Sequence, residues 1–392
     1  MIRFFRFAHA RFAAFGLLAT ALVAIAALLA PAVARAETID TAATEAIVMD
    51  YQTGAVLFEK NADQQVQPAS LSKLMTIYLL FEALKKGEVA LDDAFPVSEE
   101  AWALREGSKM FVGIGTKIRV EDLIRGIIVQ SGNDACVVVA EGLAGSVPAF
   151  VERMNAKAKE LGLTNSRFDN PHGLEDPNQL MTARDIALLS RHLIKDFPED
   201  YRYFSEKEFT FNGIKQGNRN PLLYKDPTVD GLKTGHLSVS GYSLAVSANR
   251  NGRRLIVVLI GMKSMQERSD EAAKVLDWAY REFDNYTVAK AGAVMADAPV
   301  WLGQAETVPL AVGGDLLVTL PRAARDKLSA KAVFDGPIPA PIAKGQELGK
   351  LVISAPDIAD MEVPLVAAND VPKLGFFGRV VAALKHFIGV GA

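Results

Sequence analysis

The order of apolar and polar positions changes twice between residues 37 and 287. In the middle of this segment apolar residues recur at helical spacing, which predicts helices over residues 71–86, 121–129, 134–143, 147–161 and 182–194. At both ends short β-prone runs bounded by turn residues predict strands, at residues 46–49, 55–58, 209–211, 229–233, 242–247 and 254–260. A last helix is expected over residues 267–283. Strands on both sides of a helical middle predict an α+β domain built on an antiparallel sheet.

A third pattern begins near residue 288, where short β-prone pieces alternate with frequent glycine and proline. The clearest pieces are residues 299–302, 316–320 and 351–354. We therefore expect a first domain over residues 37–287 and a small all-β domain over residues 288–367.

Residues 368–392 combine a polar, proline-containing tether with a helical pattern. On a helical wheel the apolar residues gather on one side: Phe376, Phe377, Val380, Val381, Leu384, Phe387 and Ile388. The cations gather on the other side: Arg379, Lys385 and His386. Such a helix is too short and too charged to span a bilayer and suits the membrane interface. The alternative is a C-terminal helix docked on the protein's own core.

The first 36 residues have the pattern of a signal peptide. They carry arginines near the start, an apolar run over residues 12–29 and the small-residue site Ala34-Arg35-Ala36. We expect cleavage after Ala36 and export of the mature chain. The alternative is an uncleaved N-terminal membrane anchor, since the apolar run is long.

Composition excludes several classes of function. Loss of the four arginines in residues 1–36 takes the formal charge from −3 to −7, which argues against a nucleic-acid partner. The single cysteine, Cys136, excludes a disulfide framework and lies in an apolar run, where we expect a buried, inert thiol. Neither H-E-x-x-H nor paired Cys and His spacing occurs, so no metal site or cofactor is indicated.

Candidate chemistry begins at Ser70 and Lys73, three residues apart at the start of the helix expected over residues 71–86. At that spacing the two side chains are neighbours on one helical face. A serine hydroxyl needs an adjacent base to act as a nucleophile, and a lysine whose pKa is depressed can supply one. Alone, an S-x-x-K spacing is more often an ordinary helix start.

Two further motifs follow in order along the chain. Ser131-Gly132-Asn133 lies on a loop between two apolar helices, and Lys233-Thr234-Gly235 follows a β-prone run. The ordered set of S-x-x-K, a triplet with serine and asparagine, and K-T-G is typical of penicillin-binding proteins and class A β-lactamases.

The sequence around these motifs carries a more specific resemblance. The flanking segments are Asp50-Tyr51, Pro68 to Leu71, Gln130 to Ala135, Pro171 to Leu174, Asp230 to His236 and Phe376 to Arg379. They resemble the low-molecular-mass penicillin-binding proteins that are D-alanyl-D-alanine carboxypeptidases, and the resemblance runs from signal peptide to C-terminal tail. It implies a penicillin-binding/β-lactamase-like transpeptidase domain, followed by a small β-rich domain and an amphipathic helix that anchors the enzyme at the periplasmic face of the bacterial cytoplasmic membrane.

The resemblance also implies roles in catalysis. Ser70 would attack the carbonyl between two D-alanines of a peptidoglycan stem peptide, giving a serine ester that water hydrolyses, and β-lactams would acylate the same serine. Lys73 would be the base and Ser131 a proton relay to the leaving amine. Asn133 would bind the substrate amide or Lys73. The backbone amides of Ser70 and His236 would form the oxyanion hole.

A second group of residues is implied to bind the substrate. Lys233 would recognise the terminal carboxylate and help keep the first lysine neutral. Thr234 would offer the same carboxylate a hydroxyl, within a segment completed by Gly235 and His236. Arg268, at the start of the last helix of the first domain, matches a position that also engages that carboxylate.

Alternatives remain at this level. A DD-endopeptidase or a weak β-lactamase on the same scaffold is possible, as is a non-catalytic peptidoglycan-binding envelope protein. Gly132 and the lack of an E-x-x-L-N motif argue against efficient penicillin hydrolysis, and His172 and His236 lack the G-x-S-x-G elbow that would support a Ser-His-Asp triad. The stretch Trp102 to Met110 is shorter than is usual in the family, which bears on substrate access. The sequence does not indicate an oligomeric state.

Overall fold

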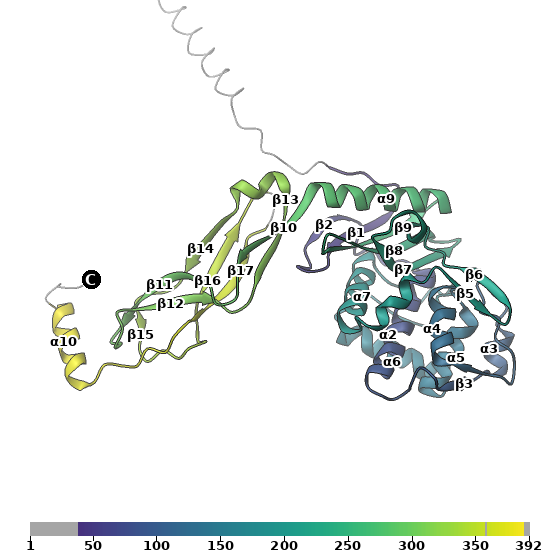
Figure 1. Cartoon of the computed structure of the whole chain (residues 1–392), viewed down its shortest axis with the longest axis horizontal. Coiled ribbons are helices and arrows are strands. Elements are labelled where there is room, and N and C mark those ends of the chain that lie inside the picture. The colour runs from purple at the N-terminus through teal and green to yellow at the C-terminus, as the bar shows by residue number, and fades with distance from the viewer. Residues whose placement is uncertain (1–37, 357–358, 388–392) are drawn as a thin grey trace, which may run out of the picture.

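The computed structural model describes residues 38–356 and 359–387. The predicted signal peptide, and Ile388 of the predicted C-terminal helix, lie outside these ranges. The described chain forms a mixed helix and sheet domain, an elongated all-β domain and a short terminal helix (Figure 1). The α+β fold class is confirmed.

One antiparallel sheet organises the first domain, with strand order β2-β1-β9-β8-β7. Its strands are β1 (Glu45–Asp50), β2 (Val56–Lys60), β7 (Val229–Leu237), β8 (Gly241–Arg250) and β9 (Arg253–Met262). Strand β1 joins the later strands by pairing with β9, so the two strand-rich ends of the segment build one sheet, as the pattern predicts.

Helices cover both faces of this sheet (Figure 1). On one side lies α9 (Met265–Glu282). On the other lie α2 (Lys73–Lys85), α4 (Val120–Ile128), α5 (Asn133–Ala144), α6 (Val147–Glu160) and α7 (Ala183–Asp196). Each face of the sheet has its own hydrophobic core, and successive side chains of β9 point into one core and then the other. The core toward α9 contains Leu255, Val257 and Leu259. The core toward the larger helical layer contains Ile256, Val258 and Ile260. The larger helical layer carries the first two predicted catalytic motifs, and strand β7 carries the third.

Several short elements were not predicted because they are too short to show a period. They are β3 (Ala94–Pro96), α3 (Glu99–Ala103), β4 (Lys117–Arg119), the 3₁₀ turn η2 (Asp200–Ser205), β6 (Ile214–Gly217) and α8 (Leu222–Lys225). Strand β6 pairs with β5 (Glu208–Phe211), which completes a hairpin around the predicted strand at residues 209–211.

The second domain is built from β-strands. Its six-stranded sheet has the order β14-β16-β17-β12-β11-β15, and β10 pairs with β13 beside it. The bounds are β10 (Phe283–Ala289), β11 (Val294–Trp301), β12 (Thr307–Val312), β13 (Leu316–Pro321), η3 (Arg322–Lys327), β14 (Ser329–Val333), β15 (Ile338–Pro339), β16 (Glu347–Ser354) and β17 (Met361–Ala367). Helix α9 runs directly into β10, and the boundary expected at residues 287 and 288 falls inside that strand.

A buried polar cluster joins the two domains. The Arg253 guanidinium donates to the carboxylate of Asp50 at 3.0 Å, and Asp50 is fully buried. From the second domain, Asn285 Nδ2 donates to the same carboxylate at 3.2 Å. Thr319 Oγ1 donates to Asn285 Oδ1 at 2.8 Å and lies 2.6 Å from Thr53 Oγ1. The domains are thus connected by hydrogen bonds as well as by the chain.

The C-terminal segment differs from the expected tether. Val371 is buried and exchanges backbone hydrogen bonds with Ile342 at 2.9 and 3.0 Å, and the Leu374 N–H donates to the carbonyl of Leu302. The chain therefore leaves the second domain only after Leu374, because its backbone is bonded to two segments of that domain that lie just outside the strands. Helix α10 (Phe376–Phe387) follows.

Within the described part of the chain, no single helix is both long and apolar enough to cross a membrane. The adjoining pair α5 and α6 reaches that length and composition only together and is bent by 84°.

Candidate active site

Ser70 lies in a 3₁₀ turn, η1 (Ala69–Ser72), immediately before α2. The buried side chains of Ala69 and Leu71 hold the turn against the core, and Ser72 Oγ donates to the Ala69 carbonyl at 2.9 Å. Ser70 itself remains half-buried. The predicted helix thus begins as a tighter turn, which presents the serine at the start of α2.

Lys73 is fully buried beside Ser70. Its Nζ lies 2.8 Å from Ser70 Oγ and 2.7 Å from Asn133 Oδ1, and it also donates to the backbone carbonyl of His172. Burial is the main cause that lowers the pKa of Lys73 to about 8. About a tenth of the amine is therefore neutral at pH 7, far more than for an ordinary lysine, and the neutral amine can accept a proton from the serine hydroxyl.

The second predicted motif surrounds the start of α5. Asn133 is its first residue, and its Nδ2 donates to the carbonyl of Glu106 at 3.0 Å while its Oδ1 accepts from the lysine. Ser131 is buried and has a left-handed backbone, with φ of 58°. The loop thus directs the side chains of Ser131 and Asn133 toward the two lysines of the site.

The third motif, Lys233-Thr234-Gly235, lies on the edge strand β7. Lys233 Nζ donates to Ser131 Oγ at 2.9 Å, and Thr234 is buried beside it. A Cβ on Gly235 would lie 3.1 Å from both the Pro68 carbonyl oxygen and the Ala69 Cβ, so a glycine lets β7 approach η1. Burial, followed by the charge of Lys73, lowers the pKa of Lys233 well below its usual value.

His236 and Arg268 lie at the outer part of the site. The exposed His236 ring stacks on Tyr242 with 4.0 Å between centroids. Arg268 is buried on α9, with its guanidinium 5.8 Å from the Tyr242 ring. Its Nε has no hydrogen-bond partner, and no carboxylate within the described ranges pairs with it. Burial lowers the pKa of Arg268 to about 10. A buried cation without a counter-ion is a good receptor for a ligand carboxylate.

The structure adds a cation that the motifs do not contain. Arg219 donates to Ser108 Oγ, its carbonyl accepts from the Arg268 guanidinium at 3.4 Å, and its charge lowers the pKa values of both Lys73 and Lys233. Its position after the β5–β6 hairpin carries no sequence signal, because only tertiary structure brings it to the motifs.

His172 does not form a Ser-His-Asp triad. Its Nδ1 accepts the Leu174 N–H at 3.2 Å, and burial together with Lys73 lowers its pKa to about 3, which makes it a weak base. The loop is packed closely here, since Gly173 has φ of 80° and a Cβ there would lie 1.9 Å from the Ala69 carbonyl oxygen. His172 contributes its backbone carbonyl to Lys73 instead.

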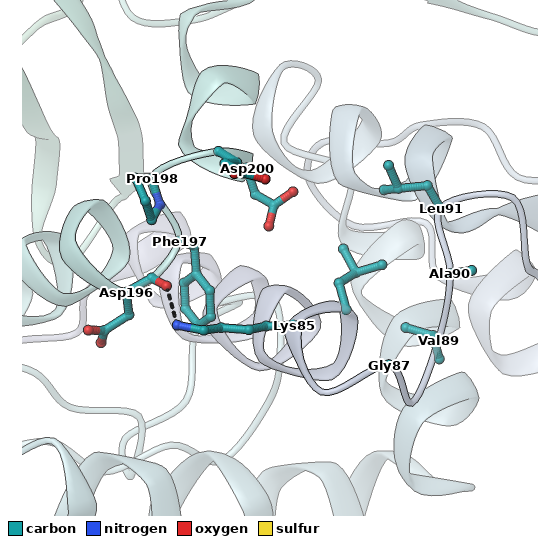
Figure 2. A pocket seen from close by; sticks show the side chains of 11 residues that line it. Lys85, Gly87, Val89, Ala90, Leu91, Asp196, Phe197, Pro198 and Asp200 are labelled. Atoms are coloured by element: carbon teal, nitrogen blue, oxygen red, sulfur yellow. Dashed lines mark hydrogen bonds between the residues drawn. The ribbon is translucent and has the colours of Figure 1, made fainter.

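A cavity of about 690 Å³ lies elsewhere, at the C-terminal end of α2 (Figure 2). Lys85 lines it, with its Nζ donating to the Asp196 carbonyl and lying over the Phe197 ring. Lys85 is twelve positions after Lys73, about 18 Å along the helix. No catalytic motif residue lines this cavity, so we place the candidate active site at the N-terminal end of α2, beside Ser70. Over the same described ranges, no group of three or more His, Cys, Asp or Glu side chains could hold a metal ion.

Comparison with known proteins finds relatives over most of the chain. A family model described as D-alanyl-D-alanine carboxypeptidase (Peptidase_S11) matches residues 32–264, and one described as penicillin-binding protein 5, C-terminal domain, matches residues 283–373. The chain is 43% identical over 364 residues to D-alanyl-D-alanine carboxypeptidase DacC of Escherichia coli (strain K12), covering 90% of this chain and 91% of the relative. It is 42% identical over 341 residues to D-alanyl-D-alanine carboxypeptidase DacA of Haemophilus influenzae, covering 85% and 86%. The crystal structure of penicillin-binding protein 5 from Haemophilus influenzae superposes with a TM-score of 0.80 at 41% identity, covering 86% of this chain and 99% of that chain.

Proposed function

The chain belongs to the peptidase S11 family of D-alanyl-D-alanine carboxypeptidases, and from this premise we propose that Ser70 is the residue its substrates acylate. The enzyme is a serine-type D-Ala-D-Ala carboxypeptidase. The observation that carries the assignment of Ser70 is its 2.8 Å contact with the buried amine of Lys73. Attack of Ser70 Oγ on the carbonyl between two D-alanines forms an ester, and water then hydrolyses it.

The proposed proton transfers use two lysine–serine contacts, Lys73 with Ser70 and Lys233 with Ser131. Neutral Lys73 accepts the hydroxyl proton as the Oγ–C bond forms, while Asn133 and the His172 carbonyl hold the amine in place. Ser131 then passes its hydroxyl proton to the nitrogen of the departing D-alanine as the C–N bond breaks, and the Lys233 ammonium, 2.9 Å from Ser131 Oγ, replaces that proton. When water hydrolyses the ester, the proton held by Lys73 returns to Ser70 Oγ, and the proton of the water returns to Lys233 through Ser131.

The terminal carboxylate of the substrate is the natural partner of the cations beyond Ser131. Lys233 and Thr234 come from β7, and Arg268 comes from α9 with an unpartnered Nε. A bound carboxylate raises the pKa of Lys233, and the resulting ammonium favours the neutral form of Lys73 by like-charge proximity. Substrate binding thereby prepares the base. The backbone amides of Ser70 and of His236, the latter on the edge of the sheet, are our candidates for the oxyanion hole.

β-Lactams carry the same carboxylate beside a strained amide, and binding them is a property of the family. The decisive test is mass spectrometry of the mature protein mixed with penicillin, with peptide mapping of the adduct. A stable adduct on Ser70 is expected, together with release of D-alanine from pentapeptides. Rapid loss of the adduct would identify a β-lactamase instead, and an adduct on another residue would overturn the assignment of Ser70. Preferential cleavage of cross-linked peptide dimers would identify an endopeptidase.

We also infer that the chain is exported and processed after Ala36. The support is the pattern of residues 1–36 and the peptidoglycan substrate of the family, which lies outside the cytoplasm. N-terminal sequencing of the protein from the cell envelope should begin at Glu37. An intact N-terminus in the membrane fraction would instead show an uncleaved anchor.

The amphipathic α10 is the proposed contact with the outer surface of the cytoplasmic membrane. Phe376 and Phe377 are 68% and 83% exposed, and Val380 and Val381 are also exposed. Such a row of uncovered apolar side chains is suited to the lipid interface, with Arg379 near anionic headgroups.

A further inference from the structure

The carboxylate of Asp134 is fully buried and accepts four backbone hydrogen bonds. Oδ1 accepts the N–H of Met110 at 2.8 Å and that of Ala135 at 3.0 Å. Oδ2 accepts the N–H of Phe111 at 2.8 Å and that of Val112 at 3.2 Å. Three of the four donors thus belong to a segment more than twenty positions earlier, which a simple helix cap would not explain.

The segment that Asp134 holds also contacts the catalytic groups. The carbonyl of Ser108 accepts the Asn133 N–H at 2.8 Å, and the carbonyl of Glu106 accepts its side-chain Nδ2 at 3.0 Å. Ser108 Oγ accepts from the Arg219 guanidinium. Residues 106–112 therefore lie against the asparagine that orients Lys73.

The same segment has a strained backbone. Phe111 has φ of 68°, a left-handed conformation that a bulky residue seldom adopts, and its ring is 46% exposed. The two hydrogen bonds to Asp134 Oδ2 come from Phe111 itself and from its neighbour. They hold a conformation that the local sequence alone disfavours.

We propose that Asp134 is a positioning residue of this enzyme, which fixes residues 106–112 against Asn133 as one wall of the active site. The inference rests on the proposed roles of Asn133 and Lys73 and adds a residue that acts through them.

Asp134 also contributes charge. The titratable groups that face Lys73 are Asp134 and Cys136 on α5, His172 on its loop, Arg219 after the β5–β6 hairpin and Lys233 on β7. Burial lowers the pKa of Lys73 and Asp134 opposes that shift. Removing the carboxylate charge is therefore expected to lower the pKa of Lys73 below about 8, and acylation should persist to lower pH.

The first test is limited trypsin digestion of Asp134→Asn without substrate. An amide can keep one acceptor toward Met110 and Ala135, but its NH₂ group then faces the N–H groups of Phe111 and Val112 and loses both bonds. Cleavage after Arg105 and Lys109, which lie in or beside the released segment, should become about tenfold faster or more.

Asp185→Asn is the matched control. Asp185 is another buried carboxylate in the first turn of a helix, and it accepts the N–H of Asn165 at 2.9 Å and the hydroxyl of Ser166 at 2.7 Å. Within the part of the chain that the structure describes, its hydrogen bonds go to Asn165, Ser166 and Thr182 and not to residues 106–112, so its replacement should leave cleavage in that segment unchanged.

Gly132→Ala tests the anchoring of residues 106–112 separately from the charge of Asp134. It also provides a second test if Asp134→Asn does not fold. A Cβ at Gly132 would lie 2.9 Å from the Met110 nitrogen and from Asp134 Oδ1, so it pushes the segment away while the carboxylate remains. Both variants should expose the trypsin sites and slow acylation by penicillin. Only Asp134→Asn should move the acid limb of the pH profile to lower pH.

Wild-type trypsin protection in a folded Asp134→Asn or Gly132→Ala variant would overturn the proposal. Equal loosening in Asp185→Asn would also overturn it, because the effect would then be general destabilisation. The digestion needs no catalysis, so failure of Ser70 as nucleophile would leave this test intact and distinguishable.

Discussion

Lys233 and Ser131 are 102 positions apart, yet the lysine Nζ lies 2.9 Å from the serine Oγ in a buried contact. On the other side of the site, Lys73 makes the same kind of contact with Ser70 at 2.8 Å. The active site therefore contains two lysine–serine pairs. In our proposal the first pair supplies the nucleophile and its base, and the second supplies the proton relay and the carboxylate receptor.

The role of Lys73 as base predicts the effect of its removal. In Lys73→Ala, Ser70 remains but nothing nearby accepts its proton, so acylation by penicillin should slow by about 10²–10⁴-fold. Stopped-flow acylation measures this directly, and the melting curve shows whether the protein remains folded. Acylation at the wild-type rate in a folded variant would exclude Lys73 as the base.

The lowered pKa of Lys73 predicts a pH dependence with a definite sign. In our proposal the neutral amine is the active form, so kcat/KM for acylation should rise as the lysine loses its proton, with a midpoint near pH 8 in the free enzyme. Below that pH the rate should fall because the ammonium form cannot accept the serine proton. A profile that is flat through this range, or that falls as pH rises, would contradict the assignment.

Recognition of the terminal carboxylate predicts a selective defect in Lys233→Ala. Its kcat/KM for D-Ala-D-Ala peptides and for penicillin should fall by about 10- to 100-fold, since a hydrogen bond to a charged group contributes about 1.5–3 kcal/mol. With a peptide amidated at its C-terminus, the loss should be clearly smaller, because only the support of proton transfer through Ser131 is then removed. Lys215→Ala, which removes an exposed lysine paired with Glu208, is the matched control. An equal loss on the amidated peptide would assign Lys233 another role.

The proposed membrane contact predicts the behaviour of a chain that ends at Gly375. The cut follows Leu374, whose N–H is bonded to Leu302, so the second domain keeps its pairing. We expect this protein to be folded, soluble and fully active on small peptides, but unable to sediment with anionic vesicles. A full-length Phe377→Ser variant should bind the vesicles more weakly, since that ring is 83% exposed. Vesicle binding by the shortened chain at the full-length level would refute the anchor.

The polar cluster between the domains predicts a large loss of stability in Asp50→Ala. The change leaves Arg253 buried without its partner, and breaking such a pair costs about 3–5 kcal/mol. Urea denaturation measures the free energy of unfolding. Glu362→Ala breaks the exposed pair with Lys350 and should cost at most about 1 kcal/mol. Similar losses of unfolding free energy in both variants would show that the buried cluster stabilises the protein no more than an exposed ion pair does.

The sequence indicated the sheet, its covering helices and the three catalytic motifs because each carries a local period or spacing. It missed Arg219, which reaches the site only through folding. It also could not show that the helix expected from residue 71 starts as a 3₁₀ turn, because that depends on packing of Ala69 and Leu71. The polar residues around Val371 predict a tether, because its backbone partner, Ile342, lies 29 positions away and leaves no local signal.

The junction of the domains has a mechanical consequence. Helix α9 continues into β10, and Asp50 and Thr53 are bonded to Asn285 and Thr319 across the boundary. Helix α10 lies at the opposite end of the elongated second domain (Figure 1). With α10 bound to a membrane as proposed, the second domain would set the height of Ser70 above the lipid. The length of that domain would then decide which stem peptides of the wall Ser70 can reach.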